Sequence, residues 1–259
     1  MFENVSIAFE DKPVLDEISF QLAKGETKAI FGVAGSGKST ILKLALGLIK
    51  PDGGHIYVLG NDVTQMREED LFELRRKIGM VFQESALFDS LTVRENVAFR
   101  LLEEGSAPEA EIEQRVREVL SFVELENTVD MLPSELSGGM RRRVAIARAI
   151  ITHPEILLYD SPTAGLDPVT STTIIELIVK QRDVYRTSSL LVTHRLQDAF
   201  VMASHYFDRN ANAMRPLPPG TRSEVPMAFL VLRDGKIIFD GDAHELAQSK
   251  DEYIREYIS

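Results

Sequence analysis

The stretch GVAGSGKS, residues 32–39, follows the short apolar run KAIF at 28–31 and precedes a helical pattern that ends near Leu48. It fits G-x-x-x-x-G-K-[ST], and a strand before it with a helix after it is the context that this loop requires. Glycines let backbone N–H groups curl around phosphate oxygens, and the helix N-terminus adds a partial positive charge. The alternative is an ordinary glycine-rich turn. The stretch predicts a phosphate-binding loop made of Gly32, Val33, Ala34, Gly35, Ser36, Gly37, Lys38, Ser39 and Thr40.

A second apolar run, EILLYD at 155–160, ends in a carboxylate. In a parallel sheet Asp160 would stand at the carboxyl edge, where α/β proteins bind ligands. With the phosphate loop, this predicts a Mg²⁺-nucleotide site in which Lys38 reaches the β- and γ-phosphates and the Ser39 hydroxyl contacts the metal. Taken alone, an acid at a strand end is more often a turn residue or a helix cap.

Strands and helices alternate along most of the chain, which predicts an α/β protein with a mostly parallel core sheet. The first sixty residues are predicted to be mainly strands, and the period is helical from about Gln65 to Thr152. Residues 208–226 are rich in Pro, Asn, Arg and Gly and are predicted to be a loop. A hairpin at 229–239 and a short helix in the tail DEYIREYIS complete the predicted elements.

The composition excludes several classes of protein. The chain has 259 residues and no cysteine, so disulfides, zinc-thiolate sites and thiol nucleophiles are excluded. A net charge of -11 argues against non-specific binding to nucleic acid, because phosphate affinity is mostly cationic. No apolar run is long enough for a membrane span, and the N-terminus has no pattern of a secretory signal. A cytosolic protein is expected.

The sequence LSGGM at 136–140 would begin a helix with a serine and two glycines, which makes a second anion-binding terminus. In isolation it would be only an N-cap with turn glycines. In the order phosphate loop, LSGGM and EILLYD, the chain resembles an ATP-binding cassette (ABC) ATPase from about Val5 to Tyr257. In that family two cassettes meet head to tail, so Ser137, Gly138 and Gly139 of one chain would close over the ATP of the other.

The resemblance also implies roles for four single residues. Phe9 stands where the family carries an aromatic residue that stacks on adenine. Gln83 resembles the Q-loop glutamine, which touches Mg²⁺ and the attacking water and senses the membrane partner. Asp167 ends AGLD, which resembles the D-loop, and His194 resembles the switch histidine that contacts the γ-phosphate. A lone histidine at a strand end is otherwise more often structural.

One position departs from the family pattern. Ser161 follows Asp160 where the family has glutamate, the general base that polarises water. A neutral hydroxyl cannot do that work, so ATP binding is expected and hydrolysis is expected to be impaired. Natural drift, an engineered trap or a displaced base would each explain the serine, and Glu84 is the nearby acid considered for the last.

The resemblance implies a P-loop NTPase cassette with an N-terminal antiparallel β subdomain and an inserted α-helical subdomain. We expect one domain at 1–250, with the helical insertion at about 84–152, the loop insertion at about 208–226, and a tail at 251–259. Such a cassette has no membrane span of its own and works with a separate permease.

Three strings are most similar to ATPases of Mla-type phospholipid transporters, which work with MCE proteins: 82–101, 131–150 and the C-terminal DAHELAQSKDEYIREYIS. This implies ATP and Mg²⁺ as ligands, an ATP-dependent homodimer, permease subunits, an MCE substrate-binding protein, a small accessory subunit, and a place on the inner face of the cell membrane. Polar amino-acid importers share much of the pattern, so such an importer is an alternative. A non-hydrolysing ATP-gated switch and a ribosome or DNA ATPase are the others.

Overall fold

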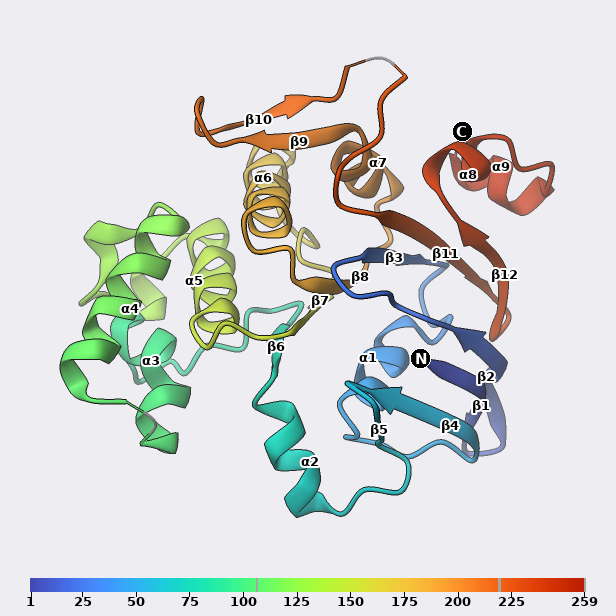
Figure 1. Ribbon diagram of the computed structural model, residues 1–259, viewed down its shortest axis with the longest axis horizontal. Helices are drawn as coiled ribbons and strands as arrows, with labels where there is room; N and C mark the ends of the chain where they lie inside the picture. Colours follow the sequence, from blue (N-terminus) through green and yellow to red (C-terminus); the bar gives the residue numbers. More distant parts are fainter. Residues whose placement is uncertain (106, 219, 259) are drawn as a thin grey trace.

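A six-stranded sheet lies at the centre of the computed structural model, which describes residues 1–105, 107–218 and 220–258 (Figure 1). The strand order is β12-β11-β3-β8-β7-β6, and all neighbours are parallel except β12, which is antiparallel to β11. The strands are β3 Thr27–Phe31, β6 Ile78–Val81, β7 Ile156–Asp160, β8 Ser188–Val192, β11 Met227–Arg233 and β12 Lys236–Gly241. The predicted mostly parallel core is confirmed.

Alternate residues of the central strands enter two different cores. Ala29 and Phe31 of β3 belong to one apolar cluster, whereas Ile30 between them belongs to the other. β7 divides in the same way, because Leu157 and Tyr159 join the first cluster and Leu158 the second. Successive side chains of a strand point to opposite faces, so apolar runs such as these predict a sheet that is covered on both sides.

One face of the central sheet is covered by a smaller antiparallel sheet and two helices. The order of the smaller sheet is β2-β1-β4-β5. Its strands are β1 Phe2–Phe9, β2 Lys12–Phe20, β4 Gly53–Val58 and β5 Asn61–Asp62, and the helices are α1 Lys38–Ala45 and α2 Glu68–Arg75. This is the predicted N-terminal antiparallel layer.

Helices cover the other face, and a helical block extends beyond α5 in Figure 1. In α4, the predicted apolar face of Ile112, Val116, Val119 and Leu120 is buried. The helices are α3 Val93–Glu104, α4 Glu109–Phe122, α5 Gly138–Ile150, α6 Pro168–Tyr185 and α7 Leu196–Ser204, with 3-10 turns at Glu126–Thr128 and Pro133–Glu135. In the part of the chain that is described, no helix is both long and apolar enough to cross a bilayer.

Two predictions about local structure were wrong. The stretch 65–152 is not helical throughout, because β6 lies inside it as a four-residue edge strand beside β7. The stretch 208–226 is not loop throughout, because β9 His205–Asp208 pairs antiparallel with β10 Ala213–Pro216. This hairpin lies beside α6, with its strands across the helix in Figure 1, and the Met214 N–H donates to Glu176 of α6 at 2.9 Å. Tertiary contacts select these strands, and a pattern of near neighbours does not reveal them.

The C-terminal segment forms α8 Ala243–Ala247 and α9 Glu252–Ile258. Asp242 caps α8 through hydrogen bonds from the backbone N–H groups of His244 and Glu245 at 2.9 and 2.8 Å. Leu246 and Ile254 are buried in the first core, so the apolar residues attach this segment to the domain. The predicted hairpin at 229–239 and the predicted helix in the tail are both confirmed.

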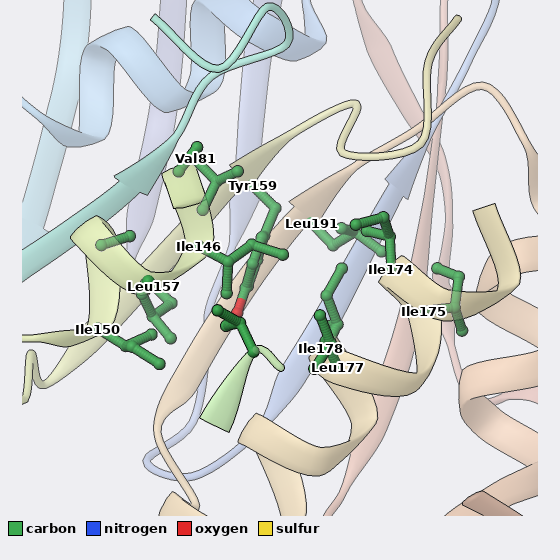
Figure 2. Close-up of a cluster of buried hydrophobic side chains, with 14 of the residues drawn as sticks. Val81, Ile146, Ile150, Leu157, Tyr159, Ile174, Ile175, Leu177, Ile178 and Leu191 are labelled. Atoms are coloured by element: carbon green, nitrogen blue, oxygen red, sulfur yellow. The ribbon is translucent and has the colours of Figure 1, made fainter. Parts of the chain in front are cut away.

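The hydroxyl of Tyr159 lies inside the first core without a hydrogen-bond partner among the described residues (Figure 2). The residue is fully buried, and burial raises the pKa of its phenol. We expect Tyr159→Phe to raise the free energy of unfolding in urea by about 1 kcal/mol, because an unsatisfied buried donor costs stability. Tyr185→Phe is the control, since Tyr185 is 44% exposed. A lower free energy of unfolding for Tyr159→Phe would contradict this reading.

Candidate nucleotide site

The phosphate loop joins the end of β3 to the start of α1, as predicted. A Cβ atom on Gly32 would lie 2.5 Å from Ser36 Oγ and 2.6 Å from the Leu232 carbonyl oxygen. A Cβ on Gly37, whose φ is 94°, would lie 2.7 Å from Leu15 Cδ2. Only glycine fits at these two positions, so the tertiary packing explains the spacing of the motif. Val33, Ala34 and Gly35 are exposed, Ser36 is buried, and Thr40 lies in the first turn of α1.

Lys38 extends back over the loop that precedes it. Its ammonium donates to the carbonyl oxygens of Gly32 and Val33 at 2.7 and 2.8 Å, and the residue is only 9% exposed. Burial lowers the pKa of Lys38, and the nearby Asp160 carboxylate opposes this effect. A buried cation held mainly by neutral carbonyls is a strong binding partner for a phosphate.

Ser39 and Asp160 meet although they are far apart in the chain. The Ser39 hydroxyl donates to Asp160 Oδ1 at 3.1 Å. A hydroxyl and a carboxylate are the hard oxygen ligands that Mg²⁺ prefers, so these two residues fit the metal that the motif implies. The predicted pair of metal ligands is therefore brought together at the carboxyl edge of the sheet.

Ser161 directly follows β7 and is buried, at 7% exposure. Its backbone is left-handed with φ 47°, its N–H donates to the Val192 carbonyl oxygen at 2.8 Å, and its own carbonyl accepts from Ala164 N at 3.0 Å. Its hydroxyl lies 3.4 Å from Asp160 Oδ1. The side chain at position 161 therefore faces the predicted metal ligand.

His194 and Gln83 follow two other strands of the same sheet. The preceding residue Thr193 donates its N–H to the Ile30 carbonyl oxygen of β3 at 3.1 Å, so the exposed His194 lies beside the strand that leads into the phosphate loop. Gln83 is exposed in the turn after β6. Phe9 ends β1 opposite Lys12 and is 47% exposed.

The LSGGM segment begins α5, as predicted. Ser137 is the N-cap, and its hydroxyl accepts from Met140 N at 3.2 Å. A Cβ on Gly139 would lie 2.4 Å from Thr170 Cγ2 of α6, whereas a Cβ on Gly138 would make only an ordinary contact with Leu166 at 3.7 Å. Gly139 is therefore required for packing within the chain, and Gly138 has room beside it.

Asp167 is the N-cap of α6, the helix whose Thr170 lies beside Gly139. Its Oδ1 accepts from the backbone N–H groups of Val169 and Thr170, both at 3.0 Å. The hydrogen bond from the Thr170 hydroxyl lowers the pKa of Asp167. Thr170 thus connects the N-terminus of α6 with Gly139 of the LSGGM segment.

One residue that the sequence reasoning did not single out also belongs to this edge. Arg142 of α5 is 5% exposed and donates to the Phe82 carbonyl oxygen at 2.9 Å and to the Ala164 carbonyl oxygen at 3.4 Å. Arg142 stands three and four residues before the buried Ala145 and Ile146, so it lies on the apolar face of the helix. A charged residue on that face is the feature of the sequence that could have identified it.

The loop after β3, the carboxylate that ends β7 and the residues after β8 and β6 lie at one edge of a parallel sheet. This arrangement defines a P-loop nucleotide-binding protein. The model of the ABC transporter family matches residues 15–164, which is more than half of the chain. The chain belongs to the ABC transporter family.

Similar proteins extend the comparison over nearly the whole chain. The chain is 39% identical over 261 residues to the chloroplastic protein TRIGALACTOSYLDIACYLGLYCEROL 3 of Arabidopsis thaliana, covering 97% of this chain and 71% of that protein. It is 32% identical over 256 residues to the intermembrane phospholipid transport system ATP-binding protein MlaF of Haemophilus influenzae, covering 99% and 88%. It is 40% identical over 200 residues to the methionine import ATP-binding protein MetN of Carboxydothermus hydrogenoformans, covering 76% and 59%.

Solved structures agree with the fold. The ATP-binding cassette MJ0796, in a dimeric post-hydrolysis state bound to ADP and Pi, is similar with a TM-score of 0.76 and 30% identity, covering 93% of this chain and 97% of that one. The structure of cbiO1 from Clostridium perfringens, part of a transporter complex, is similar with a TM-score of 0.79 and 28% identity, covering 98% and 92%. The predicted cassette fold is confirmed.

Proposed function

We propose that this ATP-binding subunit dimerises on Mg²⁺-ATP and drives a separate permease that moves phospholipid between membranes. The observation that carries the phospholipid part is the extent of the similarity to MlaF, which covers 99% of the chain. The similarity to MetN covers 76% of it. Import of an amino acid or another polar solute is the second candidate, because the identity within the shared part is higher for MetN, at 40%.

Different residues at the sheet edge are proposed to bind the phosphates, the metal and the base of the nucleotide. The backbone N–H groups of residues 32–39 and the Lys38 ammonium bind the phosphates, because they are the donors that a phosphate requires. Ser39 and Asp160, whose side-chain oxygens lie 3.1 Å apart, would hold Mg²⁺ with Gln83 as a further ligand, and the bound metal would supply positive charge beside the phosphates. Phe9 stacks on the base, and His194 contacts the γ-phosphate.

Dimerisation supplies the rest of each site. Ser137, Gly138 and Gly139 of one chain contact the γ-phosphate that is held by the other chain, and Asp167 lies at the same interface. Two features support this proposal: Ser137 is the N-cap of a helix of 13 residues, and a Cβ on Gly138 would meet its nearest atom, Leu166 Cδ2, only at 3.7 Å. A helix N-terminus with an uncrowded glycine in its first turn favours an anion from outside the chain.

Ser161 slows hydrolysis in this proposal, since the residue beside Asp160 carries no carboxylate. A non-hydrolysing switch gated by ATP is therefore the third candidate.

For each candidate we infer a protein that lies peripherally on the cytoplasmic face of the inner membrane and works with a permease. In the version that transports phospholipid, an MCE protein and a small accessory subunit complete the assembly. Genes for a permease and an MCE protein beside this gene would support that version, and a gene for a solute-binding protein there would contradict it.

The loop of residues 86–93 is the proposed permease contact. It follows the turn that holds Gln83, and Phe88 in it is 43% exposed, with its ring 4.4 Å from that of Phe99. The buried side chain of Asn96 holds the backbone of this loop: it accepts from Phe88 N at 2.8 Å and donates to the Phe88 carbonyl oxygen at 3.0 Å. An exposed aromatic ring on a rigid support suits a protein interface.

We expect Phe88→Asp to reduce copurification with the permease at least about 10-fold while the free energy of unfolding falls by less than about 1 kcal/mol. Phe72→Asp is the matched control, because Phe72 is 55% exposed on α2, outside this loop. Equal effects of the two substitutions on copurification would overturn the assignment of the contact. A large loss of stability with Phe88→Asp would mean that the ring belongs to the core.

A further inference from the structure

Two arginines of α5 donate hydrogen bonds to the backbone of the loop 82–86. Arg142 donates to the Phe82 carbonyl oxygen at 2.9 Å, and Arg148 donates to the carbonyl oxygens of Ser85 and Ala86, both at 2.7 Å. Ser85 and Ala86 have φ values of 66° and 48°, in the left-handed region that residues with a Cβ rarely adopt. Such a backbone persists only where surrounding contacts determine it. The loop that carries Gln83 therefore depends on α5 for its shape.

Arg142 also contacts a second loop. Its other terminal nitrogen lies 3.4 Å from the Ala164 carbonyl oxygen, in the turn that begins at Ser161. One guanidinium thus joins the turn after β6 to the turn after β7. Its planar fork can span two acceptors, which a lysine ammonium on a flexible stem does not reproduce.

The charge of Arg142 is retained at an energetic cost. The residue is 5% exposed, and its Nε has no hydrogen-bond partner within the described part of the chain. Burial lowers the pKa of Arg142, and the carboxylates of Glu84 and Asp160 oppose this effect. Buried ionic groups contribute little net stability compared with apolar residues of similar size. Stability alone therefore does not explain an arginine here.

The position of Arg142 on α5 connects these loops to the LSGGM segment. The helix begins at Gly138, four residues before Arg142, so about 6 Å of rigid helix separates them. A displacement of either loop at Arg142 would be transmitted through this single turn to Ser137–Gly139.

We propose that Arg142 is a positioning residue that holds the loop 82–86, the turn 161–164 and the start of α5 in one fixed arrangement. The consequence for assembly rests on the proposed function: the surface that meets the permease and the surface that meets the partner's ATP then move together. Arg142 itself touches neither the nucleotide nor the metal in this proposal.

The test compares Arg142→Met, which keeps the volume, with Arg142→Lys, which keeps the charge but loses the fork. Arg143→Met is the matched control, because Arg143 lies next on the same helix and donates to the Val123 and Glu124 carbonyls at 3.1 and 3.2 Å. Hydrogen exchange is measured first without nucleotide, on the amides of Ser85 and Ala164. Both are hydrogen-bonded within the two turns, to the Phe82 and Ser161 carbonyls.

We expect both Arg142 variants to speed exchange of these two amides about 10-fold, because a charge-assisted hydrogen bond to each turn is lost or weakened. ATP-driven dimerisation, measured by sedimentation, should weaken by a similar factor, and ATP affinity of the monomer should change less than about 3-fold. Arg143→Met should leave all three unchanged. Exchange in Arg142→Met equal to that in Arg143→Met would overturn the proposal, as would Arg142→Lys behaving like the unmodified protein.

The two proposals fail in different ways. If the unmodified protein does not dimerise with ATP, the proposed function is wrong, and the exchange of Ser85 and Ala164 still decides whether Arg142 joins the two turns. If the exchange rises but dimerisation is unchanged, Arg142 holds the loops without affecting α5, and the positioning role proposed here is wrong.

Discussion

Lys38→Ala is expected to weaken ATP binding by roughly 100-fold, equivalent to about 3 kcal/mol, because the ammonium makes charge-assisted contacts to the phosphates. The fold should tolerate the change. Lys38 is buried and its pKa is lowered by that burial, so the charge is costly in the protein without a ligand. Calorimetric titration with Mg²⁺-ATP measures the affinity, and thermal unfolding measures the stability.

Lys43→Ala is the control for this experiment. Lys43 is exposed in the last turn of the same helix α1, five residues after Lys38. It should leave ATP affinity unchanged. Unchanged affinity in Lys38→Ala would refute the nucleotide site, and a loss of affinity that accompanies unfolding would instead make Lys38 a structural residue.

Ser161→Glu is expected to raise ATP turnover by about 10²- to 10⁴-fold, because a positioned general base contributes that much to proton transfer. The backbone should accept glutamate, since a residue with a Cβ already occupies the left-handed conformation there, at φ 47°. The Ser161 hydroxyl lies 3.4 Å from Asp160 Oδ1. A glutamate side chain at this position would therefore extend from a Cβ on the same side as the predicted metal ligands.

The unmodified protein should therefore form a long-lived ATP-bound dimer. Both sites of a homodimer carry the same serine, so neither site rescues the other, and dimer opening becomes the slow step. Ser161→Glu should shorten the lifetime of that dimer in Mg²⁺-ATP, and Ser161→Ala should not. If the unmodified protein already hydrolyses ATP as fast as Ser161→Glu, another residue is the base, and Glu84→Gln is the next variant to assay.

Local sequence was enough to predict the parts of the site that depend on near neighbours. The phosphate loop was recognisable because its glycines, Lys38 and Ser39 lie within eight residues, between an apolar run and a helical pattern. The strand that ends at Asp160 and the N-cap at Ser137 were also recognisable, because each is defined by a few adjacent residues. The central sheet followed from the alternation of apolar runs with helical periods.

Only the tertiary structure showed which distant residues meet. β6 is four residues long and β10 ends in a residue unusual for a strand, Pro216, so both depend on pairing with other segments. Arg142 meets the Phe82 carbonyl across 60 positions of sequence, and Gly139 meets Thr170 of the next helix. Sequence alone identified the phosphate loop and the apolar strands, because each is a pattern of adjacent residues, although contacts with Leu232 and Leu15 are what require glycine at 32 and 37. Packing of the helices on the sheet decided the shape of the loop 82–86 and the role of Arg142, because those contacts exist only once the core has formed.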